Sequence, residues 1–170
     1  KKLSAVETLG STSVIATDKT GTLTKNQMTV ERFMIGKTTY NVGGTGYEPK
    51  GVISDAKGKP VSEAALKELD IFFAAGAMAS NARVNPPDDE HAVWYCIGDP
   101  TEGAAVTLAA KAGLNPAGLD TSYPELKEFP FDSARKLMSS VRNYGTSKNL
   151  YLFVKGAPEN VLERCNEIWD

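Results

Sequence analysis

The sequence predicts an α+β fold: a mainly antiparallel sheet flanked by helices, preceded by a short α/β stub. Residues 14–17 form a continuously apolar segment that ends at an acid, as in a strand buried on both faces of a parallel sheet. From about Thr29 onward, hairpins, glycine turns and separate helices alternate, which is typical of an antiparallel sheet. We therefore expect a stub at residues 1–28 and a larger domain at residues 29–170.

The first elements are predicted from local turn signals. Residues 3–10 are compatible with a helix, because they end at a glycine, a common helix stop. Residues 14–17 are the expected strand of the stub. Residues 30–35 and 38–42 flank a Gly-Lys turn and predict a β-hairpin. Residues 51–60 then lead through a turn-rich stretch to the next helix.

The middle of the chain predicts two helices separated by a strand. Residues 62–80 place their large apolar side chains on one helical face. The polar and proline-rich residues 85–89 form a rigid break, and residues 91–97 then predict a strand. Residues 100–112 predict the second helix, which ends at Gly113.

Three strands and a helix complete the predicted domain. The strands are expected at residues 128–131, 136–142 and 150–154, and the last two are joined by a loop that contains Gly145. The helix starts at Pro158, because proline is favoured at the first helical position.

Composition excludes several functional classes. The chain of 170 residues is 41% hydrophobic and 24% charged, as expected for a protein with a packed core. Its formal net charge of −2 gives no basic footprint, so we expect no nucleic acid partner. Cys96 and Cys165 lie far apart and are expected to be reduced thiols.

No segment of the sequence is a membrane span. The longest apolar run, residues 71–79, is about half of the roughly 20 residues that a helix needs to cross a bilayer. The sequence has neither a signal peptide nor an initiator methionine, so we expect it to be part of a larger chain.

The acid that follows residues 14–17 is a candidate nucleophile. The carboxyl end of a parallel strand is where α/β folds place their chemistry, and Asp18 there could attack a phosphoryl group. Lys19 and Thr20 could hold phosphate oxygens, and Gly21 would let the backbone approach them. A solvated junction between a strand and a turn is the alternative.

The full stretch DKTGTLT, residues 18–24, resembles the phosphorylation signature of the P-type ATPases. The flanking sequences VETLGSTSVIAT and KNQMTV are similar to the calcium-pump branch of that family. The resemblance implies that Asp18 is phosphorylated by ATP, with Lys19 and Thr20 as catalytic neighbours. It also implies that Asp18 and Thr20 contribute to a Mg²⁺ site in the full-length parent. Thr20 replaces the second acid that related phosphatases carry, so hydrolysis of the acyl phosphate should be slow.

Three further stretches resemble the nucleotide-binding domain of the same family. In GDPTEGA, residues 98–104, the resemblance implies that Glu102 faces the adenine. The alternative is a capping box at the start of a helix, which Asp99 and Glu102 also fit.

In PFDSARKLMS, residues 130–139, the resemblance implies that Phe131 stacks on the adenine and that Arg135 and Lys136 lie in the same pocket. Alternatively, Phe131 is an ordinary core residue of one strand, together with Phe129.

In VKGAPE, residues 154–159, the resemblance implies that Lys155 lies at the inner end of the pocket and that Gly156 lets the nucleotide approach. A surface lysine that ends a strand is the alternative.

Together these motifs imply the ATP-binding cytoplasmic domain of a membrane cation pump that forms an aspartyl-phosphate. Its partners would be ATP and the remaining phosphorylation, actuator and transmembrane domains of the same pump, at the cytoplasmic face of a membrane. Calcium is the expected ion, with magnesium, sodium/potassium and proton transport left open. The fragment should bind ATP without turning it over. A stand-alone ATP-binding regulatory module with an inert Asp18 remains the principal alternative, and a soluble phosphatase is a third, opposed by Thr20.

Overall fold

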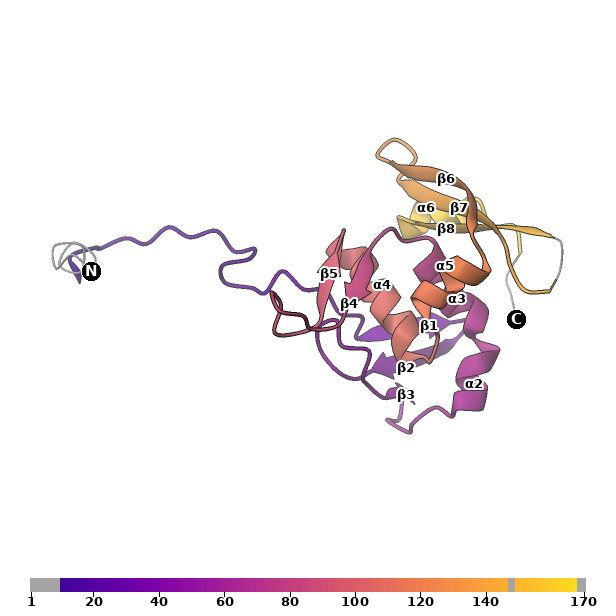
Figure 1. Ribbon diagram of the computed structural model, residues 1–170, viewed down its shortest axis with the longest axis horizontal. Coiled ribbons are helices and arrows are strands. Elements are labelled where there is room, and N and C mark those ends of the chain that lie inside the picture. Colours follow the sequence, from indigo (N-terminus) through magenta and orange to yellow (C-terminus); the bar gives the residue numbers. More distant parts are fainter. Residues whose placement is uncertain (1–9, 147–148, 168–170) are drawn as a thin grey trace.

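The computed structural model describes residues 10–146 and 149–167, and these form helices and antiparallel sheets (Figure 1). The helices are α2 (Glu63–Glu68), α3 (Asp70–Met78), α4 (Pro100–Lys111), α5 (Pro116–Ser122) and α6 (Pro158–Leu162). The strands are β1 (Arg32–Ile35), β2 (Thr38–Val42), β3 (Ile53–Asp55), β4 (Arg83–Asn85), β5 (Tyr95–Ile97), β6 (Glu125–Asp132), β7 (Leu137–Asn143) and β8 (Leu150–Gly156).

Every strand pairing in the described residues is antiparallel, so the predicted α+β class is confirmed. The one mainly antiparallel sheet that the sequence predicts is not formed by the described residues. Its described strands make three separate sheets, β1-β2-β3, β4-β5 and β6-β7-β8. Strands that follow one another in the sequence pair within each sheet. No pairing between described strands joins one sheet to the next.

Helix α3 lies between the two larger sheets and carries apolar side chains on all sides. Phe73 and Ala77 pack into a core with Phe33 of β1, while Met78 packs with Phe153 of β8 into a second core. A helix that is hydrophobic all round is stable only when it is buried. This helix therefore connects the β1-β2-β3 sheet with the β6-β7-β8 sheet, and Figure 1 shows it between them.

The predicted helix over residues 62–80 is two consecutive helices, because Leu69 leaves helical geometry with φ −99° and ψ 9°. Ser62 begins α2 by accepting a hydrogen bond from the backbone N–H of Ala65. The predicted strand at 91–97 is shorter and begins at Tyr95, since Asp88 and His91 form a turn before it.

Strand β4 and helix α5 were not predicted. Strand β4 has three residues and reaches into the expected polar break, so its pattern is too short to detect. Helix α5 had a usable signal, because Asn115 is its N-cap and Pro116 is its first residue. Strand β6 starts before the predicted residue 128, and Pro130 lies where its pairing with β7 is irregular.

The predicted strand at residues 14–17 is wrong for the structure of this chain. These residues are extended without a paired strand, and Val14 and Ile15 are about four-fifths exposed, at 78% and 81%. A strand buried on both faces needs neighbouring strands and covering helices, and the described residues supply none for it. The predicted helix at 3–10 lies almost entirely outside the described residues.

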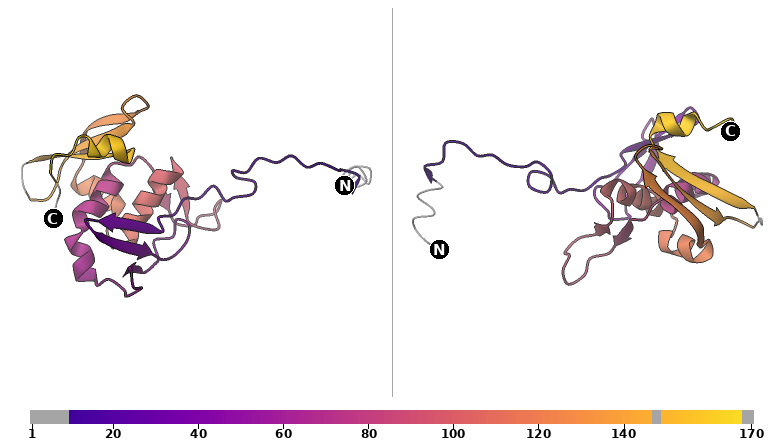
Figure 2. Two further views of the ribbon diagram at one scale, coloured as in Figure 1. Left: turned by 180° about the vertical axis from the view of Figure 1, so that it is seen from behind. Right: turned by 90° about the horizontal axis from the view of Figure 1, so that it is seen from above.

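The N-terminal segment reaches away from the packed elements in all three views (Figures 1 and 2). Contacts with the remainder begin at Met28 and Thr29, whose N–H and hydroxyl groups bond to Tyr47 and Gly46. The domain boundary predicted after residue 28 lies beside these first contacts and remains a prediction.

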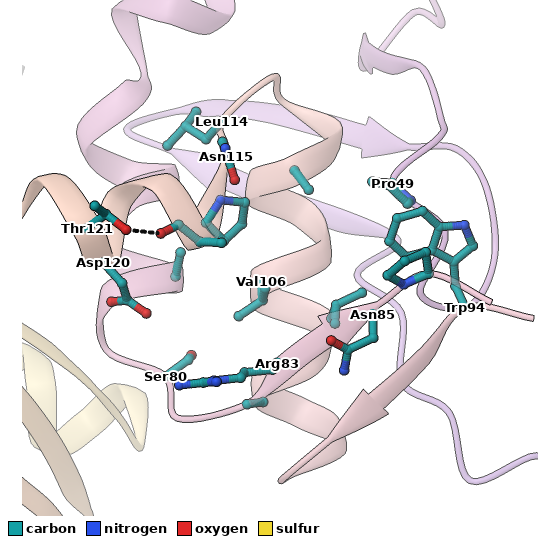
Figure 3. Close-up of a pocket in the computed structure, with 17 residues that line it drawn as sticks. Pro49, Ser80, Arg83, Asn85, Trp94, Val106, Leu114, Asn115, Asp120 and Thr121 are labelled. Atoms are coloured by element: carbon teal, nitrogen blue, oxygen red, sulfur yellow. Dashed lines mark hydrogen bonds between the residues drawn. The ribbon is translucent and has the colours of Figure 1, made fainter. Parts of the chain in front are cut away.

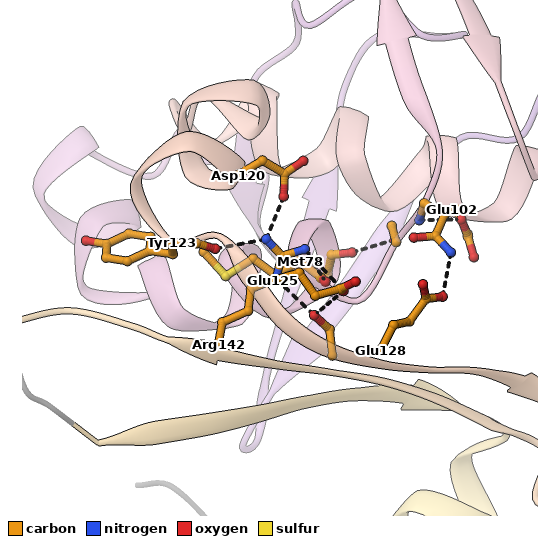
Figure 4. Close-up of polar contacts among 11 residues, drawn as sticks. Met78, Glu102, Asp120, Tyr123, Glu125, Glu128 and Arg142 are labelled. Carbon is orange, nitrogen blue, oxygen red and sulfur yellow. Dashed lines mark hydrogen bonds and ion pairs between the residues drawn. The ribbon is translucent and has the colours of Figure 1, made fainter.

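A buried guanidinium joins the β6-β7-β8 sheet to the helices (Figure 4). Arg142 of β7 donates to Asp120 of α5 at 2.6 Å and to the carbonyl oxygen of Tyr123 at 2.9 Å. It also donates to the carbonyl of Met78 at 3.4 Å and forms an ion pair with Glu125 at 3.5 Å. The Arg142 side chain is only 6% exposed, so these partners replace water around a full positive charge.

We expect Arg142→Ala to lower the free energy of unfolding by about 3 kcal/mol, near the lower limit for breaking a buried pair, because Asp120 can return to solvent. Arg142→Lys should recover only part of this loss, since an ammonium cannot reproduce the guanidinium fork. Urea denaturation measures both, with Arg32→Ala, at an exposed position of β1, as the matched control. Equal stability of the Arg142→Ala and Arg32→Ala variants would contradict the assignment.

Candidate functional site

The turn between β6 and β7 positions two of the predicted nucleotide-binding side chains. The Asp132 carboxylate accepts hydrogen bonds from the backbone N–H groups of Ala134 and Arg135, at 3.0 and 2.8 Å. The N–H of Lys136 then returns to the carbonyl of Asp132, and Lys136 takes a left-handed φ of 53°. Such a φ is uncommon for a residue with a side chain, so the surrounding bonds impose it on Lys136.

The Arg135 side chain forms hydrogen bonds with backbone carbonyl groups beside this turn. Its guanidinium donates to the carbonyl of Pro130 at 2.9 Å and more weakly to the carbonyls of Phe129 and Leu137. These bonds satisfy backbone groups where the β6–β7 ladder is irregular. Arg135 therefore has a clear structural role, and its predicted contact with a nucleotide remains a prediction.

The two neighbouring phenylalanines are not core residues. Phe131 is 63% exposed and Phe129 is 42% exposed. The alternative that both fill the core of one strand is therefore wrong. An aromatic ring that is presented to solvent beside a fixed turn is available to stack on a flat ligand.

Gly156 lets the end of β8 lie directly against the start of β7. It pairs with Leu137, and a Cβ atom at position 156 would overlap the carbonyl oxygen of Lys136. The same carbonyl accepts a hydrogen bond from the N–H of Ala157 at 3.1 Å. The glycine is thus explained by backbone packing, and it places residues 155–156 beside the start of β7, next to the turn that carries Lys136 and follows Phe131 of β6.

Lys155 points toward the helices and forms an ion pair with Glu102 of α4. The side chains are 30% and 18% exposed, so this is a half-buried pair rather than a surface contact. The other carboxylate oxygen of Glu102 accepts the backbone N–H groups of Asn81 and Ala82, at 2.7 and 3.0 Å. Lys155 does lie at the end of β8, as the alternative of a strand-ending lysine says, but it is half-buried and ion-paired and so is more than a surface lysine.

Asp99 fixes the start of the helix that carries Glu102. Its carboxylate accepts the backbone N–H groups of Thr101 and Glu102, at 2.8 and 3.1 Å, and Pro100 occupies the first turn. The bond from the N–H of Glu102 is the main reason why the pKa of the Asp99 carboxyl is lowered. The capping role of Asp99 and the ion pair of Glu102 therefore coexist.

Six predicted residues thus come together at one end of the β6-β7-β8 sheet, and these are Glu102, Phe131, Arg135, Lys136, Lys155 and Gly156. Lys136 is exposed and has no side-chain hydrogen bond or ion pair among the described residues. An exposed ring, a free cation and a half-buried cation suit a ligand with a flat base and anionic groups.

The predicted catalytic residues Asp18, Lys19 and Thr20 lie elsewhere, in the exposed N-terminal segment (Figure 1). The Asp18 carboxylate accepts the N–H of Lys19 at 2.7 Å, and the carbonyl of Lys19 accepts the N–H of Leu23 at 2.9 Å. Gly21 has a φ of 77°, as the turn requires. The motif is therefore a local turn, and the structure does not bring it to the other six residues.

A separate cavity of about 800 Å³ lies between helices α3, α4 and α5 and strand β4 (Figure 3). Trp94, Arg83 and Asn85 line it, and none of the predicted site residues does. The Asn85 amide nitrogen is buried without a hydrogen-bond acceptor in the described structure. The residues predicted to bind a nucleotide therefore lie at a sheet end and outside this cavity.

Within residues 10–146 and 149–167, no three acidic, histidine or cysteine side chains gather closely enough to hold a metal ion. In the same residues no helix has the length and apolar character needed to cross a membrane.

Comparison with known proteins defines the class to which this arrangement belongs. Residues 68–170 match the family model of the P-type ATPase, cytoplasmic domain N. The chain is 41% identical over 169 residues to a calcium-transporting ATPase of Bacillus subtilis, an alignment that covers 99% of this chain and 18% of that relative. It is 39% identical over 172 residues to the cation-transporting ATPase pma1 of Synechocystis, again over 99% of this chain and 18% of the relative.

A sodium/potassium-transporting ATPase subunit alpha of Hydra vulgaris is 37% identical over 170 residues, or 99% of this chain and 16% of the relative. The chain therefore belongs to the cation-transporting P-type ATPases and contains cytoplasmic domain N of that family. It spans less than a fifth of the length of these relatives.

Two polar residues of the site were missed by the sequence analysis. Asn81 contacts Glu102 through its backbone N–H, and its side-chain amide donates to Glu128 of β6 at 2.7 Å. A backbone donor has no sequence signal, and Glu128 is separated from Asn81 by helices and strands. Only the fold brings them together.

We expect Asp99→Ala to lower the free energy of unfolding by about 1 kcal/mol at pH 7, the usual effect of losing an N-cap. Asp99→Asn should keep most of that stability. The pKa of Asp99 is lowered in the folded state, so the ionised cap stabilises the folded protein at pH values above the ordinary carboxyl pKa of about 3.9. This stabilisation is lost as the pH falls through the pKa of the folded state. Urea denaturation at pH 7 and pH 3 should therefore show a smaller difference between the parent sequence and Asp99→Ala at pH 3. A difference that is the same at both pH values would contradict the cap.

Proposed function

We propose that this chain is the ATP-binding part of a membrane pump that couples ATP hydrolysis to cation transport through an aspartyl-phosphate on Asp18. The observation that carries the proposal is the exposed Phe131 ring at the same sheet end as Lys136 and Lys155. An adenine would stack on the ring, which contributes roughly 1–3 kcal/mol, and the cations would attract the phosphates. The chain lacks a glycine-rich P-loop, so base recognition would dominate affinity.

Calcium is the proposed ion. Calcium appears in the name of the relative in Bacillus subtilis. It also appears in that of a calcium-transporting ATPase 1 of Lactococcus lactis, which is 38% identical to this chain over 172 residues. In the parent, the domain would lie at the cytoplasmic face of a membrane and work with phosphorylation, actuator and transmembrane domains.

Asp18 would accept the γ-phosphoryl group in the parent, with its carboxylate oxygen forming the new bond and ADP leaving. Mg²⁺ is bound by one or two carboxylates together with substrate phosphates, so Asp18 and Thr20 fit part of such a ligand set. The ion would offset negative charge at the reacting oxygens. Among the described residues nothing holds the exposed Asp18 turn near Phe131, and misplacement by about 1 Å can cost a hundredfold in rate.

The separation of Asp18 from the other six residues also suits a second function, a stand-alone ATP-binding regulatory module with an inert Asp18. The two proposals agree on ATP binding and differ on whether Asp18 is ever phosphorylated.

We expect the chain to bind ATP with little dependence on Mg²⁺, because the candidate pocket has cations and an aromatic ring but no metal ligand set. Phe131→Ala should weaken ATP binding about tenfold, the equivalent of roughly 1.4 kcal/mol of lost stacking. Leu150→Ala is a matched control, since Leu150 is also 63% exposed but lies at the opposite end of β8. Calorimetric titration with ATP, with and without Mg²⁺, measures the affinities. Mg²⁺-dependent binding that survives Phe131→Ala would refute the adenine pocket.

We also expect no phosphorylation of Asp18 in this chain and phosphorylation in the full-length parent. Acid-quench labelling with γ-labelled ATP, run on both in parallel, measures the phosphoenzyme. In the parent, Asp18→Asn should abolish the label while ATP binding stays nearly unchanged, because the adenine pocket is a separate element. An unlabelled parent would favour the regulatory module, and a labelled isolated chain would show that its Asp18 segment can reach the nucleotide.

A further inference from the structure

Four residues form a continuous chain of hydrogen bonds beside the candidate site, and one of its links is a backbone N–H. Glu128 of β6 accepts from the Asn81 amide at 2.7 Å, and the Asn81 backbone N–H donates to Glu102 at 2.7 Å. The second oxygen of Glu102 holds the Lys155 ammonium. Figure 4 shows Glu102 and Glu128 in the same region, and dashed lines mark hydrogen bonds that belong to this chain.

Asn81 occupies the short connection between the end of α3 and the start of β4. Its backbone and its side chain are both engaged, one with α4 and the other with β6. The neighbouring Ala82 N–H adds a second bond to the same oxygen of Glu102 at 3.0 Å. The carboxylate therefore receives two fixed backbone donors, and its direction depends on where the 81–82 peptide lies.

Lys155 needs such a fixed counter-ion, because an ammonium on a flexible four-carbon stem has no preferred direction of its own. Glu128 and Phe131 belong to the same strand, so a bond from Glu128 to Asn81 also links the strand that bears the exposed ring to the carboxylate that holds the cation. The distance between ring and cation is then set by the hydrogen-bond chain and not by the lysine rotamer.

We propose that Asn81 and Glu128 are positioning residues of the nucleotide site. Through Glu102 they hold the Lys155 ammonium at a fixed position relative to the Phe131 ring. This inference rests on the proposed ATP binding and names residues that the sequence motifs leave out. Neither Asn81 nor Glu128 contacts the nucleotide. Their effect is to place the Lys155 charge for a ligand that carries both a base and phosphates, and so to favour ATP over adenosine.

The test compares Asn81→Ala, Glu128→Ala and Glu128→Gln in the 170-residue chain, with affinities for ATP and adenosine and thermal unfolding measured for each. Asn41→Ala is the matched control, because the Asn41 amide makes a similar bond of 3.0 Å to the carbonyl of Asp55, away from the site. Loss of one net hydrogen bond of roughly 0.5–1.5 kcal/mol predicts that Asn81→Ala and Glu128→Ala weaken ATP binding about three- to tenfold. Adenosine binding should change less than twofold, so the preference for ATP should fall.

Glu128→Gln keeps an acceptor oxygen for the Asn81 amide, and we expect it to retain the affinity and the preference of the parent sequence. A general loss of stability would instead weaken both ligands together and would also lower the unfolding temperature. The inference is overturned if Asn81→Ala and Glu128→Ala match Asn41→Ala in ATP preference, or if Glu128→Gln is as impaired as Glu128→Ala. If the parent sequence itself binds no ATP, the proposed function fails first, which the parent titration alone reveals.

Discussion

The position of the candidate site depends on one buried charge, the guanidinium of Arg142. It ties β7 to α5 and to the end of α3, and these contacts set how the β6-β7-β8 sheet lies against the helices. All the predicted nucleotide residues except Glu102 belong to that sheet or to its turn. Glu102 belongs to α4, so its ion pair with Lys155 forms only when sheet and helices are correctly docked. The buried guanidinium favours this one arrangement of sheet and helices, because any arrangement that left it buried without partners would be strongly unfavourable.

Within the stretch PFDSARK, structural and binding roles are divided between neighbouring residues. The side chains of Asp132 and Arg135 form hydrogen bonds with backbone groups in and beside the turn. The side chains of Phe131 and Lys136 make no hydrogen bonds among the described residues and are left exposed. The motif can be understood as a rigid turn that presents one ring and one cation, which explains why four of its residues are polar although only some of them would meet a ligand.

Elements with nearby partners could be predicted from the sequence, and elements with distant partners could not. The β1–β2 hairpin and helix α4 were found because their turn and capping residues lie within or beside them. The strand at residues 14–17 failed for the opposite reason, since an apolar run forms a buried strand only when other strands meet it. The site followed the same division: its motif residues were visible in the sequence, whereas Asn81 was not, because its partners Glu102 and Glu128 lie on elements that are distant in the sequence.

The ion pair between Lys155 and Glu102 has a consequence for how the charges at this end of the sheet respond to ionic strength. A cation that already holds a carboxylate presents little net charge to the surroundings, so mobile ions have little to screen. The exposed Lys136, by contrast, attracts an anion over a distance that shrinks as salt is added. This end of the sheet therefore presents one exposed charge whose attraction for anions weakens as salt is added, and one half-buried ion pair whose short-range contact persists at higher salt.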